Sequence, residues 1–369
     1  MLIFWILLGS ALLFVLQYCL YSMSWTRGLS LSLRFEQNTA TEGDTINLTE
    51  RTENRKWLPL PMLSYEYILD RNFAPVNETS ARKPIVFRRK VALPGRRASI
   101  NQSSIKGLPR GYYTVHAAKL SSTDLFYTSK WEMQISCQSR LTVYPGKIPG
   151  EKLSLPFRQL LGAVLTRRMA QEDPFQIKGI RPYEIYDSLR TVNWKASAKT
   201  GELKVNQFEY STDEAIVFLL DMGSGSEEAR EELLRLASSL SQLFLRRGVS
   251  VSFWSNGRNC VSGSAARVPS GSGLGHQAVL DDSLARIKLS ASVTAPFKDF
   301  LQELPAHVTA KALPVALSAD DSAEAVAAFR SVFGPGGGYM ISVSGKAKSR
   351  KEGGVTVLSW DPAAEEVRP

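Results

Sequence analysis

The chain begins with a predominantly apolar run that holds no charged residue between Leu2 and Thr26. At about 1.5 Å per residue, a helix of this length spans the ~30 Å hydrocarbon core of a bilayer. Aromatic residues lie near both ends, as in the interfacial belts of membrane helices. We therefore predict a transmembrane anchor over residues 1–26. A cleaved signal peptide is the alternative, although neither a basic leader nor a small-residue cleavage site is evident.

The basic residues around this segment lie on its C-terminal side. Arg27, Arg34, Arg51, Arg55 and Lys56 follow the apolar run, and only the free amino terminus precedes it. The positive-inside rule then places the larger, C-terminal part in the cytoplasm. We expect a single-pass protein of the cell membrane whose C-terminal domains are cytoplasmic.

Residues 27–145 consist of short runs in which apolar and polar positions partly alternate. The runs include TINLT, SYEYIL, WEMQISC and RLTVYP, and stretches such as TEGD and LPGR are typical of turns. Several short strands at close spacing are typical of an antiparallel β-sandwich, which we predict for this region.

Residues 146–210 are expected to link this domain to the next. The run PFRQLLGAVLTRRMAQ has helical apolar spacing, and its basic residues lie near the C-terminal end, where the helix dipole favours them. A packed surface helix is the expected role, with a partner-docking helix as the alternative. The stretch GIRPYEIYDSLRTVNWKASAKTGELKVNQFE follows, without any helical stripe.

Between residues 211 and 369 the pattern alternates between strand and helix. AIVFLLD is a near-continuous apolar run, which is typical of a strand buried on both faces. The following stretch places Leu233, Leu236 and Leu240 on one helical face, and Ser224 with Glu227 fits a capping box. This alternation continues to GVTVLSW and predicts a parallel, doubly wound α/β sheet. The whole chain is thus expected to be an α+β multidomain protein.

Composition and charge exclude some classes of function. The 369 residues carry a formal net charge of +10. The basic residues are spread along the chain and no basic tract has interleaved aromatics, so nucleic-acid binding is not expected. The three cysteines and three histidines lack metal-ligand spacing, which argues against a disulfide framework and a zinc site.

Asp221 ends the AIVFLLD strand, at the edge where doubly wound sheets bind ligands. An aspartate with hydroxyls two and four residues later could hold Mg²⁺, because hard cations prefer oxygen ligands. Those positions are Gly223 and Gly225, and the hydroxyls belong to Ser224 and Ser226. We expect Asp221 to cap backbone amides of the next turn, with a Mg²⁺ site as the alternative and no other cofactor.

Enzymatic activity is not expected. Glu184, Asp187 and Asp221 could serve as general acids or bases, but no histidine lies near them in the sequence. Motifs of serine hydrolases, zinc proteases and phosphate-binding loops are not found. A hydrolase with an unrecognised site is the alternative.

The stretch over residues 179–209 resembles the signature of a bacterial family of membrane proteins with a von Willebrand A-like domain, domain-of-unknown-function family 58. The positions that carry the resemblance are Gly179, Arg181, Tyr183, Asp187, Arg190, Val192, Asn193, Trp194, Ser197, Ala198, Leu203, Val205, Phe208 and Glu209. Tyr186 stands where the family usually has glycine, and Lys199 where it usually has arginine. RGYYTV, TDLF and LTVYP resemble further family elements, so the resemblance covers nearly the whole chain.

The resemblance implies a membrane-anchored, non-enzymatic adaptor or scaffold that binds a MoxR-type AAA+ ATPase. It also implies that residues 211–369 form a von Willebrand A-like domain. The family's Asp-x-Ser-x-Ser metal motif would fall on Asp221, but this sequence breaks it at Gly223 and Gly225. An outward-facing, metal-dependent adhesion-type protein is the alternative. It requires the opposite topology and Mg²⁺ binding at Asp221.

Two roles fit the central motif. As a structural keystone, Trp194 would bury its ring, Arg190 would pair with Asp187 or a carbonyl, and Asn193 would bind loop amides. As a partner surface, the same segment would face solvent. We expect the keystone role, which predicts that Trp194→Ala lowers the melting temperature.

Overall fold

The computed structural model describes residues 1–71, 85–154, 157–170, 172–210, 215–289, 293–304, 312–334, 338–343 and 349–362. The chain divides into two compact units. Unit 1 comprises Met1–Gly146 together with Leu284–Lys288, and unit 2 comprises Lys147–Ser283 and Leu289–Pro369. The segment predicted as a linker, residues 146–210, thus belongs almost entirely to unit 2.

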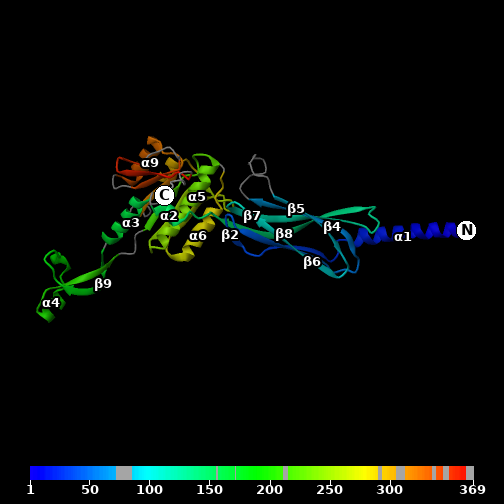
Figure 1. Ribbon diagram of the computed structural model, residues 1–369, viewed down its shortest axis with the longest axis horizontal. Helices are drawn as coiled ribbons and strands as arrows, with labels where there is room; N and C mark the ends of the chain where they lie inside the picture. Colours follow the sequence, from blue (N-terminus) through cyan, green and yellow to red (C-terminus); the bar gives the residue numbers. More distant parts are fainter. Residues whose placement is uncertain are drawn as a thin grey trace. The chain divides into compact units, whose positions relative to one another are not determined.

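Helix α1 (Leu2–Ser24) is the one helix in the described residues that is long and apolar enough to cross a membrane (Figure 1). Its mean hydropathy over an 18-residue window is 2.2, and 6% of that window is buried. Exposing apolar surface to water is unfavourable by a free energy of about 25 cal/mol for each Å². Length and composition therefore support a single-pass anchor, although a signal sequence meets the same criteria.

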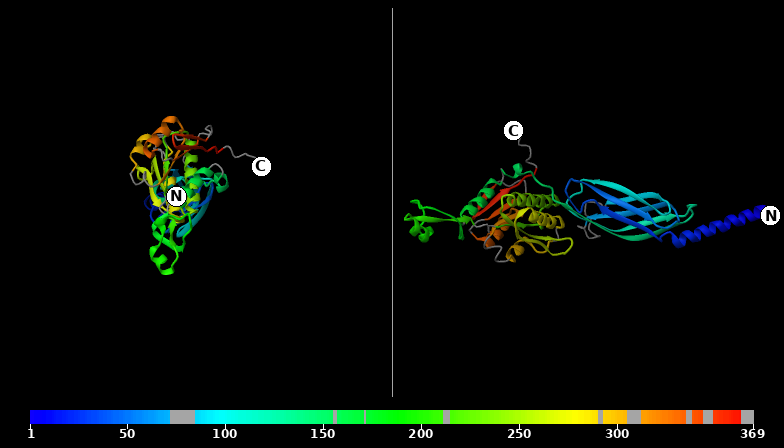
Figure 2. Two further views of the ribbon diagram at one scale, coloured as in Figure 1. Left: turned by 90° about the vertical axis from the view of Figure 1, so that its left-hand side faces the viewer. Right: turned by 90° about the horizontal axis from the view of Figure 1, so that it is seen from below.

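The rest of unit 1 contains two β-sheets (Figure 2). The first has the antiparallel order β1–β3–β6, formed by Leu29–Phe35, Thr45–Asn54 and Arg97–Lys106. The second has the order β2–β8–β7–β4–β5, formed by Thr39–Thr41, Lys130–Tyr144, Gly111–Thr123, Leu60–Arg71 and Ile85–Leu93. Only the β2–β8 pair in these two sheets is parallel. The two sheets agree with the predicted antiparallel sandwich.

The core of unit 1 lies between the inward faces of these sheets. Leu48 on β3 and Leu63 on β4 belong to one continuous buried cluster. Glu50 also points inward, where its carboxylate accepts hydrogen bonds from the hydroxyls of Tyr65 and Tyr67, both at 2.6 Å. Arg89 Nε lies 3.0 Å from the same carboxylate. The buried charge is thus paired and hydrogen-bonded, which is the condition for its tolerance in a core.

Two features of the strand prediction for unit 1 are wrong. WEMQISC and RLTVYP were predicted as separate strands but form the single strand β8, because a register shift opposite Val115–Ala117 lets the pairing with β7 continue. Strands β2 and β6 have no counterpart in the prediction. Strand β6 has the mostly polar sequence RASINQSSIK, in which Ile105 is the one buried residue, so the run shows no apolar alternation from which to predict a strand.

Unit 2 is built around a seven-stranded sheet in the order β13–β12–β11–β14–β15–β17–β16. The strands are β11 (Ala215–Leu220), β12 (Ser250–Arg258), β13 (Ala265–Gly271), β14 (Leu313–Ser318), β15 (Tyr339–Ser342), β16 (Arg350–Glu352) and β17 (Val355–Ser359). All pairs from β12 to β17 are parallel, and both edge strands are antiparallel. The predicted strand–helix alternation is therefore confirmed, with β13, β14 and β16 missing from the prediction.

Helices cover both faces of this sheet (Figure 1). They are α2 (Gly150–Ser154), α3 (Arg158–Ala170), α5 (Glu227–Leu245), α6 (Gly273–Ala285), α7 (Phe297–Gln302) and α9 (Ala323–Phe333). Val217 of β11 belongs to the same buried cluster as residues of α7 and α9, whereas the ring of Phe218 contacts Phe244 of α5. Because successive strand residues point to opposite faces, β11 is buried on both sides, as its apolar run predicted.

The N-terminus of α5 differs from the predicted capping box. Ser226 caps the helix, and its hydroxyl accepts a hydrogen bond from Ala229 N at 3.3 Å. Ser224 instead donates to Asp221, so the box of Ser224 with Glu227 does not form. Gly225 has a φ of +76°, and a Cβ there would lie 2.4 Å from Ala319 Cβ. This close approach and the positive φ favour glycine over serine at position 225.

The signature stretch forms a small separate sheet in unit 2. Strand β9 (Glu172–Pro182) pairs antiparallel with β10 (Lys204–Tyr210). The connection between them contains a short 3₁₀ helix (Leu189–Thr191) and helix α4 (Trp194–Thr200), drawn in green in Figure 1. We call this connection, residues 183–203, the signature loop.

Candidate functional site

An ion pair fixes the start of the signature loop. Asp187 accepts hydrogen bonds from Arg181 Nη1 at 2.6 Å and from Glu184 N at 2.8 Å. These bonds, with Arg181 first, hold the pKa of the Asp187 carboxyl below its usual value. Of the two partners predicted for Arg190, Asp187 or a carbonyl, Asp187 is wrong, because Arg181 occupies its carboxylate in a two-pronged contact and Arg190 is exposed.

Asn193 organises the second half of the loop, as predicted. Its Oδ1 accepts from Ala196 N at 3.0 Å and so caps α4, while its Nδ2 donates to Asn206 Oδ1 at 2.7 Å. Ser197 Oγ donates to Asn193 O at 2.8 Å and accepts from Lys204 N at 2.9 Å. The polar residues of the motif therefore tie α4 to strand β10.

Trp194 does not bury its ring, which corrects the keystone prediction. It is the first residue of α4 and is 67% exposed. The loop is instead supported by Val192, whose side chain is buried and whose backbone forms an isolated bridge with Val205. A buried and an exposed tryptophan look the same in a sequence without helical or strand periodicity, so the pattern could not distinguish them.

Three further apolar side chains of the signature loop face solvent. Ile185 is 88% exposed, Tyr186 is 87% exposed and Leu189 is 65% exposed. Soluble proteins seldom gather large exposed apolar residues in one short segment unless the segment is an interaction surface. The sequence did not single out Ile185 and Leu189, because apolar residues without periodicity do not show whether they face the core or the solvent.

The other signature residues lie on or next to the hairpin. Gly179 is opposite Gln207 in the strand pair, and Tyr183 N donates to Leu203 O at 2.9 Å. Ala198 is an exposed residue of α4. Phe208 and Glu209 lie in β10, and their side chains lie outside the described part of the structure.

Asp221 lies at the carboxyl edge of the seven-stranded sheet and is 4% exposed. Its Oδ1 accepts from Gly223 N at 2.9 Å and Asn256 Nδ2 at 3.1 Å. Its Oδ2 accepts from the hydroxyls of Ser224 at 2.6 Å and Ser318 at 2.9 Å. Asn256 and Ser318 lie in or at the ends of the neighbouring strands β12 and β14. The predicted capping of a turn amide is thus confirmed, within a network that spans three strands.

This network does not fit a bound Mg²⁺. Each carboxylate oxygen of Asp221 already accepts two hydrogen bonds, so a cation would have to displace donors. No group of three or more His, Cys, Asp or Glu side chains in the described residues is arranged to hold a metal ion. Asn256 and Ser318 were missed by sequence reasoning, although each is a polar residue at the end of a largely apolar run.

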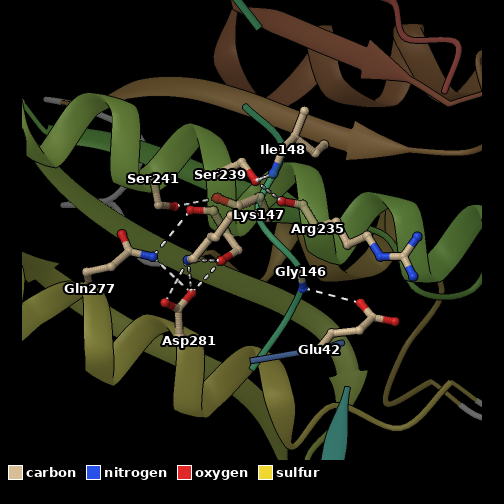
Figure 3. Close-up of polar contacts among 11 residues, drawn as sticks. Glu42, Gly146, Lys147, Ile148, Arg235, Ser239, Ser241, Gln277 and Asp281 are labelled. Carbon is tan, nitrogen blue, oxygen red and sulfur yellow. Dashed lines mark hydrogen bonds and ion pairs between the residues drawn. The ribbon is translucent and has the colours of Figure 1, made fainter. Parts of the chain in front are cut away.

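A second polar cluster in unit 2 combines an amine, a hydroxyl and a carboxylate (Figure 3). Lys147 Nζ donates to both carboxylate oxygens of Asp281, at 2.8 and 2.7 Å, and also contacts Ser238 Oγ. Gln277 Nε2 donates to Asp281 Oδ1 at 2.9 Å. Burial lowers the pKa of Lys147, and the Asp281 carboxylate opposes that shift. Because Ser238 is fully buried, no substrate reaches its hydroxyl, and the cluster fastens Lys147 to helices α5 and α6.

One family model and one distant relative match parts of this chain. A family model described as "Protein of unknown function DUF58" matches residues 179–326. The "Uncharacterized protein YeaD" of Bacillus subtilis (strain 168) is 22% identical over 255 residues, which cover 69% of this chain and 62% of that protein. The chain thus spans less than two thirds of that relative's length.

The likeness to solved structures is low. The CARDB domain of the PF1109 protein from Pyrococcus furiosus, solved with di-metal ions, is 8% identical and covers 32% of this chain and 90% of its own, with a TM-score of 0.21. A GH20 exo-β-N-acetylglucosaminidase from Vibrio harveyi is 10% identical and covers 63% and 47%, with a TM-score of 0.22. Scores this low carry no argument about fold or function. Residues 179–326, which run from β9 to the first turn of α9, match the DUF58 family model, and the function of that family is unknown.

Proposed function

We propose that this protein is a membrane-anchored, non-enzymatic binding protein, an adaptor or scaffold whose partner is a MoxR-type AAA+ ATPase. The identity of the partner rests on the family resemblance. The observation that carries the binding role is the set of exposed apolar residues Ile185, Tyr186, Leu189 and Trp194 in the signature loop. Tyrosine and tryptophan, here Tyr186 and Trp194, are enriched among the residues that dominate the binding energy of protein interfaces.

The frame beneath these residues supports an interaction surface. The Arg181–Asp187 pair, the Asn193 cap and the Val192–Val205 bridge order the loop before any partner arrives. A preordered surface loses less conformational entropy on binding, so more of its contact energy is available as affinity. The polar residues of the signature loop thus fix its conformation, and its exposed apolar residues would contact the partner.

We further propose that the seven-stranded sheet is von Willebrand A-like. When β11, β12, β13, β14, β15 and β17 are numbered one to six, the sheet reads 3-2-1-4-5-6, with the third strand antiparallel. This doubly wound order has its switch point between β11 and β14. Asp221 and Ser318 lie at that point, but the closed network there favours protein binding over the metal-dependent adhesion alternative.

The orientation belongs to the same proposal. Arg27, Arg55 and Lys56 follow α1, and basic residues next to a membrane helix favour the cytoplasmic side. A cytoplasmic C-terminal part faces the compartment in which an AAA+ ATPase has access to ATP.

A pull-down tests the binding role. Tagged full-length protein is recovered from its native membrane in mild detergent, with ATP or with ADP, and its partners are identified by mass spectrometry. We expect nucleotide-dependent recovery of an AAA+ ATPase. The double variant Tyr186→Ser/Trp194→Ser should lose it without a change in melting temperature. Ile100→Ser removes an exposed apolar residue of β6 and serves as the matched control. Recovery of envelope or extracellular proteins alone would contradict the proposal.

A calorimetric titration tests the adhesion alternative. We expect no binding heat when Mg²⁺ or Mn²⁺ is added to the full-length protein. A saturable heat that disappears in Asp221→Asn would favour metal-dependent binding instead.

A further inference from the structure

The C-terminal half of α1 does not stand clear of the β-sandwich in unit 1. Phe14 stacks on Phe126 of the β7–β8 turn, with ring centroids 6.1 Å apart. Gln17 Nε2 donates to Asp124 Oδ2 at 2.8 Å, and Trp131 packs against Tyr18 and Tyr21. The turn therefore lies alongside the helix.

The position of Phe14 sets the depth of this turn. Phe14 lies roughly ten residues before the end of α1 at Ser24, which corresponds to about 15 Å along a helix. A hydrocarbon core of ~30 Å needs about 20 helical residues, and the part of α1 before Phe14 is too short to supply them. If α1 crosses a bilayer, Phe126 must therefore enter that bilayer with it.

The β7–β8 turn has the composition for such a position. Leu125, Phe126 and Tyr127 are all about half exposed or more in the absence of lipid. Asp124 beneath them is fully buried, and its carboxylate is satisfied by Gln17 and by the amides of Thr128 and Ser129. The charged group of the turn is thus enclosed, and apolar side chains form its outer surface.

An apolar groove connects the turn to the helix. It has a volume of about 840 Å³ and lies between α1 and Phe126, lined by Leu7, Gly9, Ser10, Ala11, Leu13, Phe14 and Phe126. The groove is continuous with the exposed surface of a helix that is suited to acyl chains. Acyl chains are consequently the occupant that the surroundings of the groove favour.

Basic residues surround the same end of unit 1. We call Arg27, Arg55, Arg96 and Arg97, which are all exposed, the basic collar. Backbone hydrogen bonds join their turns, from Arg55 N to Gly28 O and from Arg96 N to Lys56 O, both at 2.8 Å. Arg27, Arg96 and Arg97 form no salt bridge among the described residues. The exposed ring of Trp57 lies in one of these turns.

We propose that this end of unit 1 is seated in a bilayer that contains anionic phospholipid: the β7–β8 turn enters the apolar region beside α1, and the basic collar binds lipid phosphates. Apolar and aromatic residues at the interface, combined with cations at the headgroup level, are the general determinants of such binding. The proposal shares only the membrane helix with the proposed adaptor function and does not depend on the partner of the signature loop.

Depth-dependent quenching tests the position of the turn. In full-length protein with Cys19, Cys137 and Cys260 replaced by alanine, Phe126→Cys is labelled with an environment-sensitive fluorophore. Lys106→Cys, at the other end of β6, is the matched control. In nanodiscs that hold one chain each, we expect nitroxides on lipid acyl chains to quench the label at position 126 and aqueous iodide to quench it several-fold less than the label at 106. Equal quenching of the labels at positions 126 and 106 by iodide would overturn the proposal. Protection that appears only when a disc holds two chains would also overturn it, in favour of a second copy.

Lipid charge tests the basic collar. We expect quenching of a label at Trp57→Cys, in one of the turns of the collar, to increase several-fold when the nitroxide-bearing headgroup is changed from a neutral to an anionic lipid. The triple variant Arg27→Gln/Arg96→Gln/Arg97→Gln should lose this increase. The triple variant Arg34→Gln/Lys106→Gln/Arg140→Gln removes the same charge from exposed positions on the sandwich away from the collar and should retain it. An increase that is equal in both variants would overturn the role of the collar. The collar variant should still recover the ATPase in the pull-down. That result would show that the collar and the proposed adaptor function are independent of each other.

Discussion

Asp221 accepts four hydrogen bonds, two from the turn that follows β11 and one each from β12 and β14, so its charge is a structural element of unit 2. Asp221→Asn keeps the shape but places an NH₂ donor among groups that are themselves donors. A buried polar group without a partner costs about 1–3 kcal/mol. We expect the variant to lower the melting temperature of the full-length protein in detergent by several degrees, measured by intrinsic fluorescence. Asp320→Asn, at an exposed position, should change it little, and equal melting of both variants would contradict the structural role.

Trp194, unlike Asp221, is expected to contribute little to the stability of the fold. Because its ring is exposed, Trp194→Ala should change the free energy of unfolding by no more than about 0.5 kcal/mol. Val192→Ala truncates a buried side chain of the same loop and should lower the free energy of unfolding clearly more than Trp194→Ala does. A large loss of stability in Trp194→Ala, measured by the same melting experiment, would restore the keystone interpretation.

Lys56 provides a prediction about pH. Its ammonium donates to Trp25 O at 2.7 Å, and burial lowers the pKa of Lys56 to about 8. Because an unfolded lysine titrates near 10.4, the unfolded chain binds more protons between these two pH values. The contribution of Lys56 to stability should therefore rise from about pH 8 to about pH 10.4. In NMR spectra of ¹³C-labelled lysines in neutral detergent, the signal lost in Lys56→Met should titrate near pH 8, and a midpoint above 10 would refute the shift.

At the scale of elements, the contact of Lys147 with α5 and α6 should act as a unit. Lys147→Met leaves the buried Asp281 without its cation, which typically costs about 3–5 kcal/mol. The double variant Lys147→Met/Asp281→Leu removes both charges, so we expect it to recover part of that loss in chemical denaturation. Losses that simply add in the double variant would show that the two side chains are energetically independent.

The reliability of the sequence prediction also varied by element. Helix α5 was predicted well because its apolar residues repeat on one face, but its cap was misplaced by two residues because Ser224 is used by Asp221. Strand β14 is fully buried and short, so it shows no alternation from which to predict it. In the candidate site, Asn193 acts on its neighbours in sequence and was predicted. The Asp221 network joins residues 35 and 97 positions apart, and no local pattern encodes such a distance.

At the scale of the whole molecule, the cytoplasmic orientation can be tested with the native cysteines. Cys260 in unit 2 is partly exposed, Cys137 is buried, and Cys19 lies on α1. We expect a membrane-impermeant maleimide to leave Cys260 unlabelled in intact cells and to label it in inverted membrane vesicles. Cys260→Ser identifies the labelled position. Labelling of Cys260 in intact cells would place unit 2 outside and revive the adhesion alternative.

Arg110 has a consequence for the biosynthesis of this protein. Its guanidinium is fully buried, and Nη1 donates to the carbonyls of Leu284, Ala285 and Ile287 at 2.7, 3.1 and 3.0 Å. Unit 1 therefore depends on a segment synthesised long after its own strands. At about 5–20 residues per second, a ribosome needs roughly ten seconds or more to reach that segment after Gly146. During this time α1 is already available for membrane insertion, while the sandwich carries a cation without these acceptors. A nascent chain that ends at residue 146 should accordingly be more sensitive to protease than one that extends beyond residue 288.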